Sequence, residues 1–346
     1  MITIIGAGAI GGVIGGYLAK GGRQVEFVDI DKEHVEKMNA KGLTIELPDS
    51  SFTVPVNAYN MDEFLRLGDP LDKVYLCVKA QHTKDTVKSF KHLLQNTSYV
   101  VSFQNGLNEL AIAEQIGKER TVGCFVNLFA DYLEPGKVNY GGKGSVYIGE
   151  LTGEITPRIK DLHQDLMAWG EAQITDNIFG YLWGKLGYAA ILMATALTNE
   201  TIADVLDNKE HQTMLFDLAA EVLAVADAKG IKAMGFDDWN TAWAYPVEKR
   251  DWAMITKEVA IHVARLRSYT KTRTGIWRDI AVRKRKTEVV EQMTPIVKEA
   301  KLLDICVPML ECLVSMFADI DEGKRELSLK NLEILHKVHK EKLAQK

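Results

Sequence analysis

At 346 residues, the chain is too long for one ordinary hydrophobic core and fits two domains. Hydrophobic residues make up 47% and charged residues 26%, which is globular composition and excludes a mainly disordered chain. The formal net charge of -5 argues against a general nucleic-acid binder or a protein of anionic membrane surfaces. We therefore expect a globular protein whose partners include neither nucleic acid nor membrane.

Cysteine usage and the chain's start indicate the compartment. The cysteines show no CxxC spacing, as expected of free thiols in a reducing environment. No basic segment precedes the apolar run Ile2–Ile5, and the longest apolar stretch, Tyr188 to Leu197, is far shorter than the roughly 20 residues of a membrane span. These features predict a cytoplasmic protein.

The first half of the chain alternates short β-branched runs with segments of helical periodicity. The runs that read as strands buried on both faces are Ile2–Ile5, Val25–Val28, Val74–Val78 and Tyr99–Phe103. This alternation predicts an α/β domain built on a doubly wound parallel sheet of the Rossmann type, which we place at residues 1–177.

The second half, residues 178–346, is expected to be a helical domain that serves substrate binding and dimerisation. Its helical patterns cover Ile178–Leu206, His211–Gly230, Trp252–Thr270, Thr287–Leu302, Met309–Ile320 and Leu327–Lys346. The last of these reads as an exposed basic helix, which we expect to cover an edge or a partner subunit. We also expect a homodimer, joined through the helical domain.

A glycine-rich motif, Gly6-Ala7-Gly8-Ala9-Ile10-Gly11, stands between the first strand and the first helix. In a dinucleotide fold the first glycine makes the tight turn, the second admits the pyrophosphate, and the third lets the helix pack on the strand. The helix N-terminus then holds the phosphates through its free N–H groups. We expect Gly6, Gly8, Ala9, Ile10 and Gly11 to bind a dinucleotide.

Asp29 ends the second predicted strand, about 20 residues after the motif. A carboxylate here accepts hydrogen bonds from ribose hydroxyls and repels the extra phosphate of NADP. The cofactor NAD(H) is therefore favoured over NADP(H). The alternative is that Asp29 caps a helix beginning near Lys32.

Further motifs follow in a characteristic order: Val78-Lys79-Ala80, Gln104-Asn105-Gly106-Leu107, Glu134-Pro135-Gly136, Trp183-Gly184-Lys185-Leu186, and Arg278-Asp279-Ile280 running to Thr287-Glu288-Val289. With the glycine motif, they resemble the ketopantoate reductase (2-dehydropantoate 2-reductase) family over nearly the whole chain. The resemblance implies a Rossmann domain followed by a helical domain like that of 6-phosphogluconate dehydrogenase. It also implies an enzyme of pantothenate biosynthesis type, which reduces a 2-oxo acid to a 2-hydroxy acid with NAD(P)H.

The resemblance implies catalytic roles for Lys185 and Asn105 and a cofactor contact for Lys79. Lys185 matches the catalytic lysine, whose ammonium donates a proton as charge builds on the carbonyl oxygen. Its apolar neighbours on a helix would partly desolvate it and lower its pKa. Asn105 would position Lys185 and the nicotinamide or substrate, and Lys79 matches a lysine beside the cofactor. The alternatives are a snorkelling Lys185, a turn at Asn105-Gly106 and a solvated loop charge at Lys79.

Substrate residues are implied in the second half. Glu288 matches the glutamate that binds the substrate hydroxyl and is counted with the catalytic residues, although a helical glutamate is otherwise a surface residue. Thr274 or Gly275 stands where the family has a serine for the carboxylate. Arg278 could bind a carboxylate or phosphate of the substrate, since arginine suits bidentate recognition.

The chain departs from the family at two positions after Lys185. Ala189 and Met193 replace asparagines that contact substrate in the family, so the substrate need not be 2-dehydropantoate. The alternatives are an NAD-dependent dehydrogenase of a different 2-hydroxy acid and a non-catalytic nicotinamide-binding sensor. The combination of Lys185 with Glu288 favours an enzyme.

A basic run, Arg283–Lys286, is the exception to the acidic balance. Lys271, Arg278 and Arg285 are spaced by seven and are expected to share one helix face. The run either touches the substrate, lies in solvent or pairs with acids of another helix. The histidines and cysteines show no ligand spacing, so we expect no metal.

Overall fold

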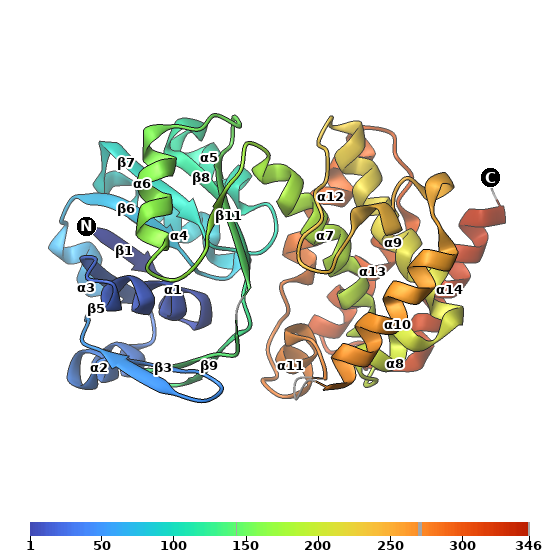
Figure 1. Ribbon diagram of the computed structural model, residues 1–346, viewed down its shortest axis with the longest axis horizontal. Helices are drawn as coiled ribbons and strands as arrows, with labels where there is room; N and C mark the ends of the chain where they lie inside the picture. Colours follow the sequence, from blue (N-terminus) through green and yellow to red (C-terminus); the bar gives the residue numbers. More distant parts are fainter. Residues whose placement is uncertain (143, 269–271, 345–346) are drawn as a thin grey trace. The chain divides into compact units, whose positions relative to one another are not determined.

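The computed structural model describes residues 1–142, 144–268 and 272–344. The chain forms two compact units, Met1–Phe179 and Gly180–Lys346. The first is an α/β unit and the second is helical (Figure 1), as the sequence pattern predicts. The expected fold class is confirmed.

An eight-stranded sheet forms the centre of unit 1. Its strands follow the order β12 (Gln173–Ile174), β11 (Ser145–Glu150), β8 (Thr121–Asn127), β7 (Leu94–Ser102), β6 (Leu71–Leu76), β1 (Ile2–Ile5), β2 (Val25–Asp29) and β5 (Asn57–Asn60). The sheet is mixed rather than purely parallel, because β11 runs antiparallel to β8. Between β8 and β11, the described residues form the short strands β9 and β10 and no crossover helix of the kind that parallel strands need.

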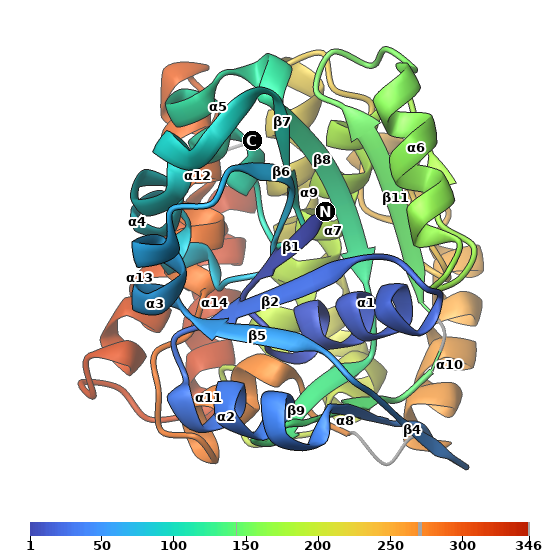
Figure 2. The same ribbon diagram turned by 90° about the vertical axis from the view of Figure 1, so that its left-hand side faces the viewer.

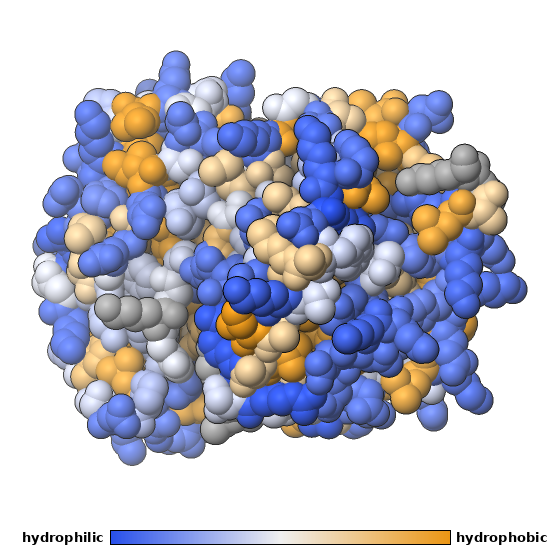
Figure 3. All heavy atoms as spheres, turned by 45° about the vertical axis from the view of Figure 1, so that its right-hand side comes forward, coloured by the Kyte–Doolittle hydropathy of each residue, from blue (hydrophilic) through white to orange (hydrophobic). Residues whose placement is uncertain are grey.

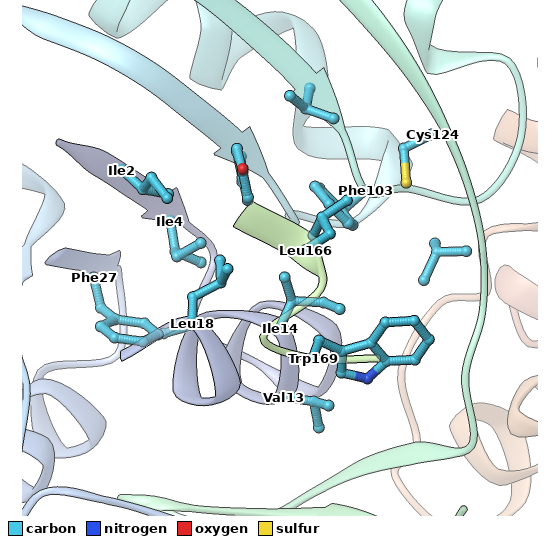
Figure 4. Packing of buried hydrophobic residues seen from close by; sticks show 14 of the residues in the cluster. Ile2, Ile4, Val13, Ile14, Leu18, Phe27, Phe103, Cys124, Leu166 and Trp169 are labelled. Atoms are coloured by element: carbon cyan, nitrogen blue, oxygen red, sulfur yellow. The ribbon is translucent and has the colours of Figure 1, made fainter. Parts of the chain in front are cut away.

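Helices cover both faces of this sheet, which makes it doubly wound. Those of unit 1 are α1 (Ala9–Lys20), α2 (Lys32–Lys41), α3 (Met61–Leu67), α4 (Thr83–Phe90), α5 (Asn108–Ile116) and α6 (Pro157–Leu166). One apolar cluster joins the sheet to α1 and α6, and a second joins it to α3, α4 and α5. Figure 2 shows α1 and α6 on the face opposite α4 and α5. In Figure 4, Ile14 and Leu18 of α1 lie close to Ile4 of β1.

A second, four-stranded sheet, absent from our prediction, packs on α1. It has the order β4 (Ser51–Val54), β3 (Leu43–Glu46), β10 (Lys137–Tyr140) and β9 (Ala130–Glu134). A Cβ atom added at Gly15 would lie 2.5 Å from the Phe27 ring of the main sheet, and one added at Gly16 would lie 2.5 Å from Ile45 of the second sheet. Helix α1 is therefore enclosed by both sheets, and its paired glycines permit the close approach.

Unit 2 consists of helices joined by irregular segments. They are α7 (Ile178–Thr195), which begins in the last residues of unit 1, α8 (Ile202–Asp207), α9 (Lys209–Ala228), α10 (Trp252–Ser268), α11 (Gly275–Ala281), α12 (Val289–Leu302), α13 (Pro308–Asp321) and α14 (Leu329–Ala344). Short 3-10 turns occur in both units: η1 (Ala80–His82), η2 (Lys91–Leu93) and η3 (Lys118–Arg120) in unit 1, and η4 (Thr241–Trp243) and η5 (Val247–Lys249) in unit 2. No helix in the described residues is long and apolar enough to cross a bilayer.

Two helical predictions for unit 2 need correction. The stretch Ile178–Leu206 is two helices, because Thr201 caps α8 by accepting a hydrogen bond from the Asp204 N–H at 3.1 Å. The C-terminal helix α14 packs on α9 and α13 within unit 2, with Leu332 and Leu335 buried. The Asp217 and Glu221 carboxylates of α9 bind its polar side chains.

Candidate active site

The glycine loop has the geometry that dinucleotide binding requires. Gly6 has a φ of +95°, and a Cβ there would lie 2.9 Å from the Cys77 backbone. A Cβ at Gly11 would lie 2.9 Å from Ile4 of β1, so this glycine lets α1 pack on the strand. Around Gly8, by contrast, no described atom outside its adjoining chain segment lies within 4 Å of an added Cβ.

The start of α1, with Ala9 and Ile10 in its first turn, is not closed by protein groups. Among the described residues no side chain caps α1 at Gly8, so the first turn keeps N–H groups for a ligand. The open space at Gly8 and this uncapped helix start fit the pyrophosphate of a nicotinamide dinucleotide.

Asp29 is fixed beside this loop. Its Oδ2 accepts a hydrogen bond from the Ala7 N–H at 2.7 Å, and its Oδ1 accepts one from the Asp31 N–H at 3.0 Å. The cap of α2 is Asp31, whose Oδ1 accepts from the His34 N–H at 3.2 Å. The alternative role of Asp29 as the helix cap is therefore wrong. Its carboxylate stands at the end of β2, where a ribose is bound in Rossmann folds.

Lys79 follows β6, the neighbour of β1, and Asn105 follows β7, the next strand along the sheet. Ile5 pairs with Leu76, and Leu76 pairs with Ser102, all in parallel register. The loops after β1, β6 and β7 therefore begin at the same edge of the sheet, which is where open α/β sheets bind ligands. The Lys79 side chain is half-buried and Asn105 is exposed. The structure thus brings the glycine loop, Lys79 and Asn105 to one edge.

Gln104, to which the sequence analysis gave no role, joins these loops. The buried amide of Gln104 donates hydrogen bonds to the Val78 carbonyl and the Thr83 hydroxyl, both at 2.7 Å. The Thr83 hydroxyl donates to Asn108, whose amide donates to the Asn105 carbonyl at 2.6 Å. A hydrogen-bond network centred on the buried Gln104 therefore links the segments that carry Lys79 and Asn105. Gln104 belongs to the Gln104-Asn105-Gly106 motif, in which only Asn105 was given a role from the sequence.

Glu109, in the first turn of α5, is fully buried four residues after Asn105. Burial raises the pKa of its carboxyl to about 8, and the neighbouring Ser102 hydroxyl and Cys124 backbone offset this only in part. The carboxyl is therefore mainly protonated at neutral pH. The sequence pattern, which places polar residues of a helix on its surface, did not predict this.

In unit 2, Lys185 lies in the first half of α7. Its side chain is half-buried, between the buried Trp183 and Leu186. The Trp239 indole donates to the Gly184 carbonyl at 3.0 Å, and the Tyr188 hydroxyl lies 3.2 Å from the His262 ring nitrogen Nε2. These contacts fix the helix on both sides of Lys185.

The other expected substrate residues of unit 2 lie on α11 and α12. Thr274 is the N-cap of α11, and its hydroxyl accepts from the Trp277 N–H at 3.0 Å. Arg278 lies half-buried within α11, and Glu288 occupies the N-cap position of α12, also half-buried. Thr274 and Glu288 are therefore at helix starts and Arg278 is in the last turn of α11, all on elements separate from that of Lys185.

The expected basic helix face is wrong. Helix α11 ends at Ala281, so Arg285 cannot share its face with Arg278. Lys271 lies outside the described residues. Arg283 and Arg285 instead turn back to the buried Asp279, with nitrogen–Oδ1 distances of 3.2 and 2.9 Å. Two charges of the run therefore pair with an acid of their own segment.

The two replaced family positions differ in burial. Met193 is 1% exposed and belongs to the hydrophobic core of unit 2, whereas Ala189 is half-buried. Neither side chain offers the donor or the strong acceptor of the amide that the family has at its position. In the described part of the chain, no group of three His, Cys, Asp or Glu residues could hold a metal ion.

Family models match both halves of the chain. The model described as "Ketopantoate reductase PanE/ApbA" matches residues 2–153, and "Ketopantoate reductase PanE/ApbA C terminal" matches residues 177–321. The 2-dehydropantoate 2-reductase of Pyrococcus horikoshii is 30% identical over 67% of this chain and 75% of its own length. That of Pyrococcus abyssi is 28% identical over 89% of this chain and 93% of its own.

Solved structures share the fold. A ketopantoate reductase of this family from Ralstonia eutropha is 24% identical, with a TM-score of 0.76 over 94% of this chain and 99% of its own. A D-mandelate dehydrogenase in a ternary structure with NADH and anilino(oxo)acetate is 20% identical, with a TM-score of 0.77 over the same shares. The resemblance stated from the motifs is confirmed: the chain belongs to the ketopantoate reductase family, and it is a nicotinamide-dependent oxidoreductase that acts on CH–OH groups.

Proposed function

We propose that the protein reduces a small 2-oxo acid to the corresponding 2-hydroxy acid, in the manner of a 2-dehydropantoate 2-reductase. The observation that carries this proposal is the open, uncapped glycine loop at the same sheet edge as Lys79 and Asn105. The relatives named 2-dehydropantoate 2-reductase support the substrate class.

The chain's own residues supply binding and proton transfer. Gly6, Gly8, Ala9, Ile10 and Gly11 would hold the pyrophosphate of the reduced dinucleotide, whose nicotinamide would supply the hydride. Lys185 donates the proton that neutralises the developing alkoxide. Asn105 orients the reacting groups, and Lys79 adds a positive charge beside the cofactor.

The remaining roles concern the substrate. Glu288 accepts a hydrogen bond from a substrate hydroxyl, and Thr274 and Arg278 bind its carboxylate. These assignments follow the family motifs residue by residue. In this proposal, unit 1 binds the cofactor and unit 2 provides Lys185 and the substrate contacts.

The cofactor in this proposal is NADH rather than NADPH. The Asp29 carboxylate, fixed at the end of β2, would accept from ribose hydroxyls and repel a 2′-phosphate. The D-mandelate dehydrogenase of similar fold was solved with NADH. Fluorescence titration tests the preference: we expect tighter binding of NADH than of NADPH, and clearly tighter NADPH binding would contradict the role of Asp29.

A second candidate is an NAD-dependent dehydrogenase of another 2-hydroxy acid. It is favoured by Ala189 and Met193, since neither can hydrogen-bond the hydroxyl groups of pantoate. A panel of 2-hydroxy acids with NAD, including D-pantoate and D-mandelate, distinguishes the two. Faster oxidation of an apolar acid than of pantoate would select the second candidate. Cofactor binding without turnover of any acid would indicate a sensor.

Assembly and location complete the proposal. We infer a homodimer through unit 2, where α10 exposes Met254 and Ile261 by 43% and 53%. The face drawn in Figure 3 is mostly hydrophilic, with separate hydrophobic areas. Light scattering after gel filtration tests the dimer. A cytoplasmic location agrees with four free cysteines, of which Cys306 is exposed.

A further inference from the structure

His34 connects two segments of unit 1 that are distant in sequence. It is the third residue of α2 and is 1% exposed. Its Nε2 lies 2.9 Å from the carbonyl oxygen of Ala7 in the glycine loop. The N–H of Gly136, in the turn between β9 and β10, donates to its Nδ1 at 2.8 Å. Both ring nitrogens are therefore engaged by backbone groups.

The two partners determine the form of the imidazole. A carbonyl oxygen only accepts a hydrogen bond, and a backbone N–H only donates one. Nε2 must therefore carry a proton, and Nδ1 must present its lone pair. His34 is thus a neutral imidazole in the Nε2–H tautomer, since a second ring proton would point at the Gly136 N–H.

The conformation of the β9–β10 turn places the Gly136 N–H against the His34 ring. Gly136 has a φ of +79°, which favours glycine, and its carbonyl accepts from the Thr44 N–H at 2.9 Å. The Tyr132 ring packs edge-on against the imidazole at 5.1 Å between centroids, and its hydroxyl donates to Asp31. The Glu134-Pro135-Gly136 motif thereby acquires a structural role.

The Ala7 carbonyl matters because it shares a peptide group with Gly8. In a trans peptide the C=O and the following N–H point in opposite directions. A hydrogen bond from His34 to the Ala7 carbonyl therefore fixes the direction of the Gly8 N–H. On the other side of Ala7, its own N–H is held by Asp29 at 2.7 Å. Both peptides that flank Ala7 are thus held by side chains.

We propose that His34 is a positioning residue for dinucleotide binding, which orients the Gly8 N–H by holding the Ala7 carbonyl against the β9–β10 turn. The proposal needs only that unit 1 binds the cofactor, and it is independent of the substrate and of Lys185. It predicts that the donor arm, Nε2–H to Ala7, controls affinity for the pyrophosphate, whereas the acceptor arm to Gly136 serves mainly to fix the ring.

Two substitutions separate the arms. In H34N the amide oxygen can replace Nδ1 toward Gly136, but no donor reaches Ala7. In H34Q the longer amide can donate to Ala7, and the Gly136 N–H loses its acceptor. Since an unmet buried group costs on the order of tenfold in an equilibrium constant, we expect about tenfold weaker NADH binding in H34N and less than about threefold in H34Q.

A matched control lies in the same unit. The Nε2 of His163 on α6 lies 2.9 Å from the Ala172 carbonyl, a bond of the same kind in a different part of unit 1. H163N should lower thermal stability and leave the Kd for NADH unchanged. ADP-ribose, which has the pyrophosphate without the nicotinamide, should show the same loss as NADH in H34N.

The tautomer gives a readout that does not depend on binding. In ¹⁵N-histidine-labelled wild-type protein without ligand, the His34 signals, identified by their absence in H34Q, should have the shifts of a neutral Nε2–H ring. Wild-type NADH affinity in H34N, or equal loss in H34N and H163N, would overturn the proposal. If H34N does not fold, two other results would overturn the proposal. One is ¹⁵N shifts of a charged or Nδ1–H His34 ring in the wild type, and the other is a tenfold loss of NADH affinity in H34Q.

Discussion

The glycine-loop edge of unit 1 and the substrate helices of unit 2 position their candidate residues by different means. At the edge, backbone groups are held by buried side chains, such as Gln104 under the Asn105 loop and His34 under Ala7. In unit 2, Lys185 projects from a continuous helix, and Thr274 and Glu288 stand at helix starts.

This difference indicates which residues the fold constrains, namely those that hold the glycine loop, and which can vary, namely those on a helix face. A side chain that holds the loop supports several backbone groups at once, so its replacement disturbs cofactor binding as a whole. A side chain on a helix face can change with little effect on the helix. Ala189 and Met193, both on α7, are such departures from the family pattern: apolar residues stand where the family has asparagines, and the helix is unbroken.

The largest effect is expected in unit 2, from Lys185→Ala. Loss of the proton donor should lower kcat by roughly 10² or more. Because the cofactor is bound by unit 1 in our proposal, the Kd for NADH should stay near the wild-type value. Turnover close to wild type would show that Lys185 is not the acid, and a large loss of NADH affinity would remove the contrast between the two regions.

Glu109→Gln tests whether the buried Glu109 carboxyl, in the first turn of α5, makes stability depend on pH. The pKa of Glu109 is about 8 in the folded protein and about 4.5 in the unfolded chain. The stability that protonated Glu109 contributes is therefore complete below pH 4.5 and is lost as the pH rises to about 8. The wild type should thus lose about 2 kcal/mol or more between pH 5 and 8 in urea unfolding, and Glu109→Gln should not. Glu114→Gln on the same helix, where the carboxylate is exposed, should behave as wild type. Parallel pH profiles for wild type and Glu109→Gln would contradict this account.

Gln104→Leu removes the link between the Lys79 and Asn105 loops. The Val78 carbonyl and Thr83 hydroxyl would lose their shared donor, which should cost about 2 kcal/mol of unfolding free energy. The KM for NADH should also rise, because both loops lie at the cofactor edge. Gln115, whose amide donates to the Lys84 carbonyl in a solvent-exposed hydrogen bond, provides the control: Gln115→Leu should change neither quantity. If the two variants behave alike, the network has no special role.

Asp29→Asn should have the smallest effect. The amide oxygen keeps one acceptor for the Ala7 N–H, while the charge that repels a 2′-phosphate is lost. The ratio of the NADPH Kd to the NADH Kd should fall about tenfold, which corresponds to about 1.4 kcal/mol. An unchanged ratio would mean that other residues select the cofactor.

The sequence predicts the elements with long or repeated patterns. β1 and β2, and the helices at 209–228 and 308–321, agree with the expected ranges to within a few residues. The second sheet could not be predicted in the same way, because its strands carry no continuous apolar run of the kind that marks β1. The break before α8 had a local signal, Thr201 followed three residues later by Asp204, which we did not use.

For the candidate site, motifs identify residues that project into it but not those that support it. A single histidine in a helix, such as His34, has no distinctive sequence context, and its partners at positions 7 and 136 come together only in the fold. The spacing of Arg278 and Arg285 gave a wrong prediction because it assumed a continuous helix, whereas the chain leaves α11 at Ala281.

The most direct test of the proposed function is a spectrophotometric assay of the purified protein with NADH and NADPH against a panel of 2-oxo acids that includes 2-dehydropantoate. We predict oxidation of the reduced nicotinamide that depends on a 2-oxo acid, with a higher kcat/KM for NADH than for NADPH. Failure of every 2-oxo acid to promote oxidation, although the cofactor binds, would contradict the proposal.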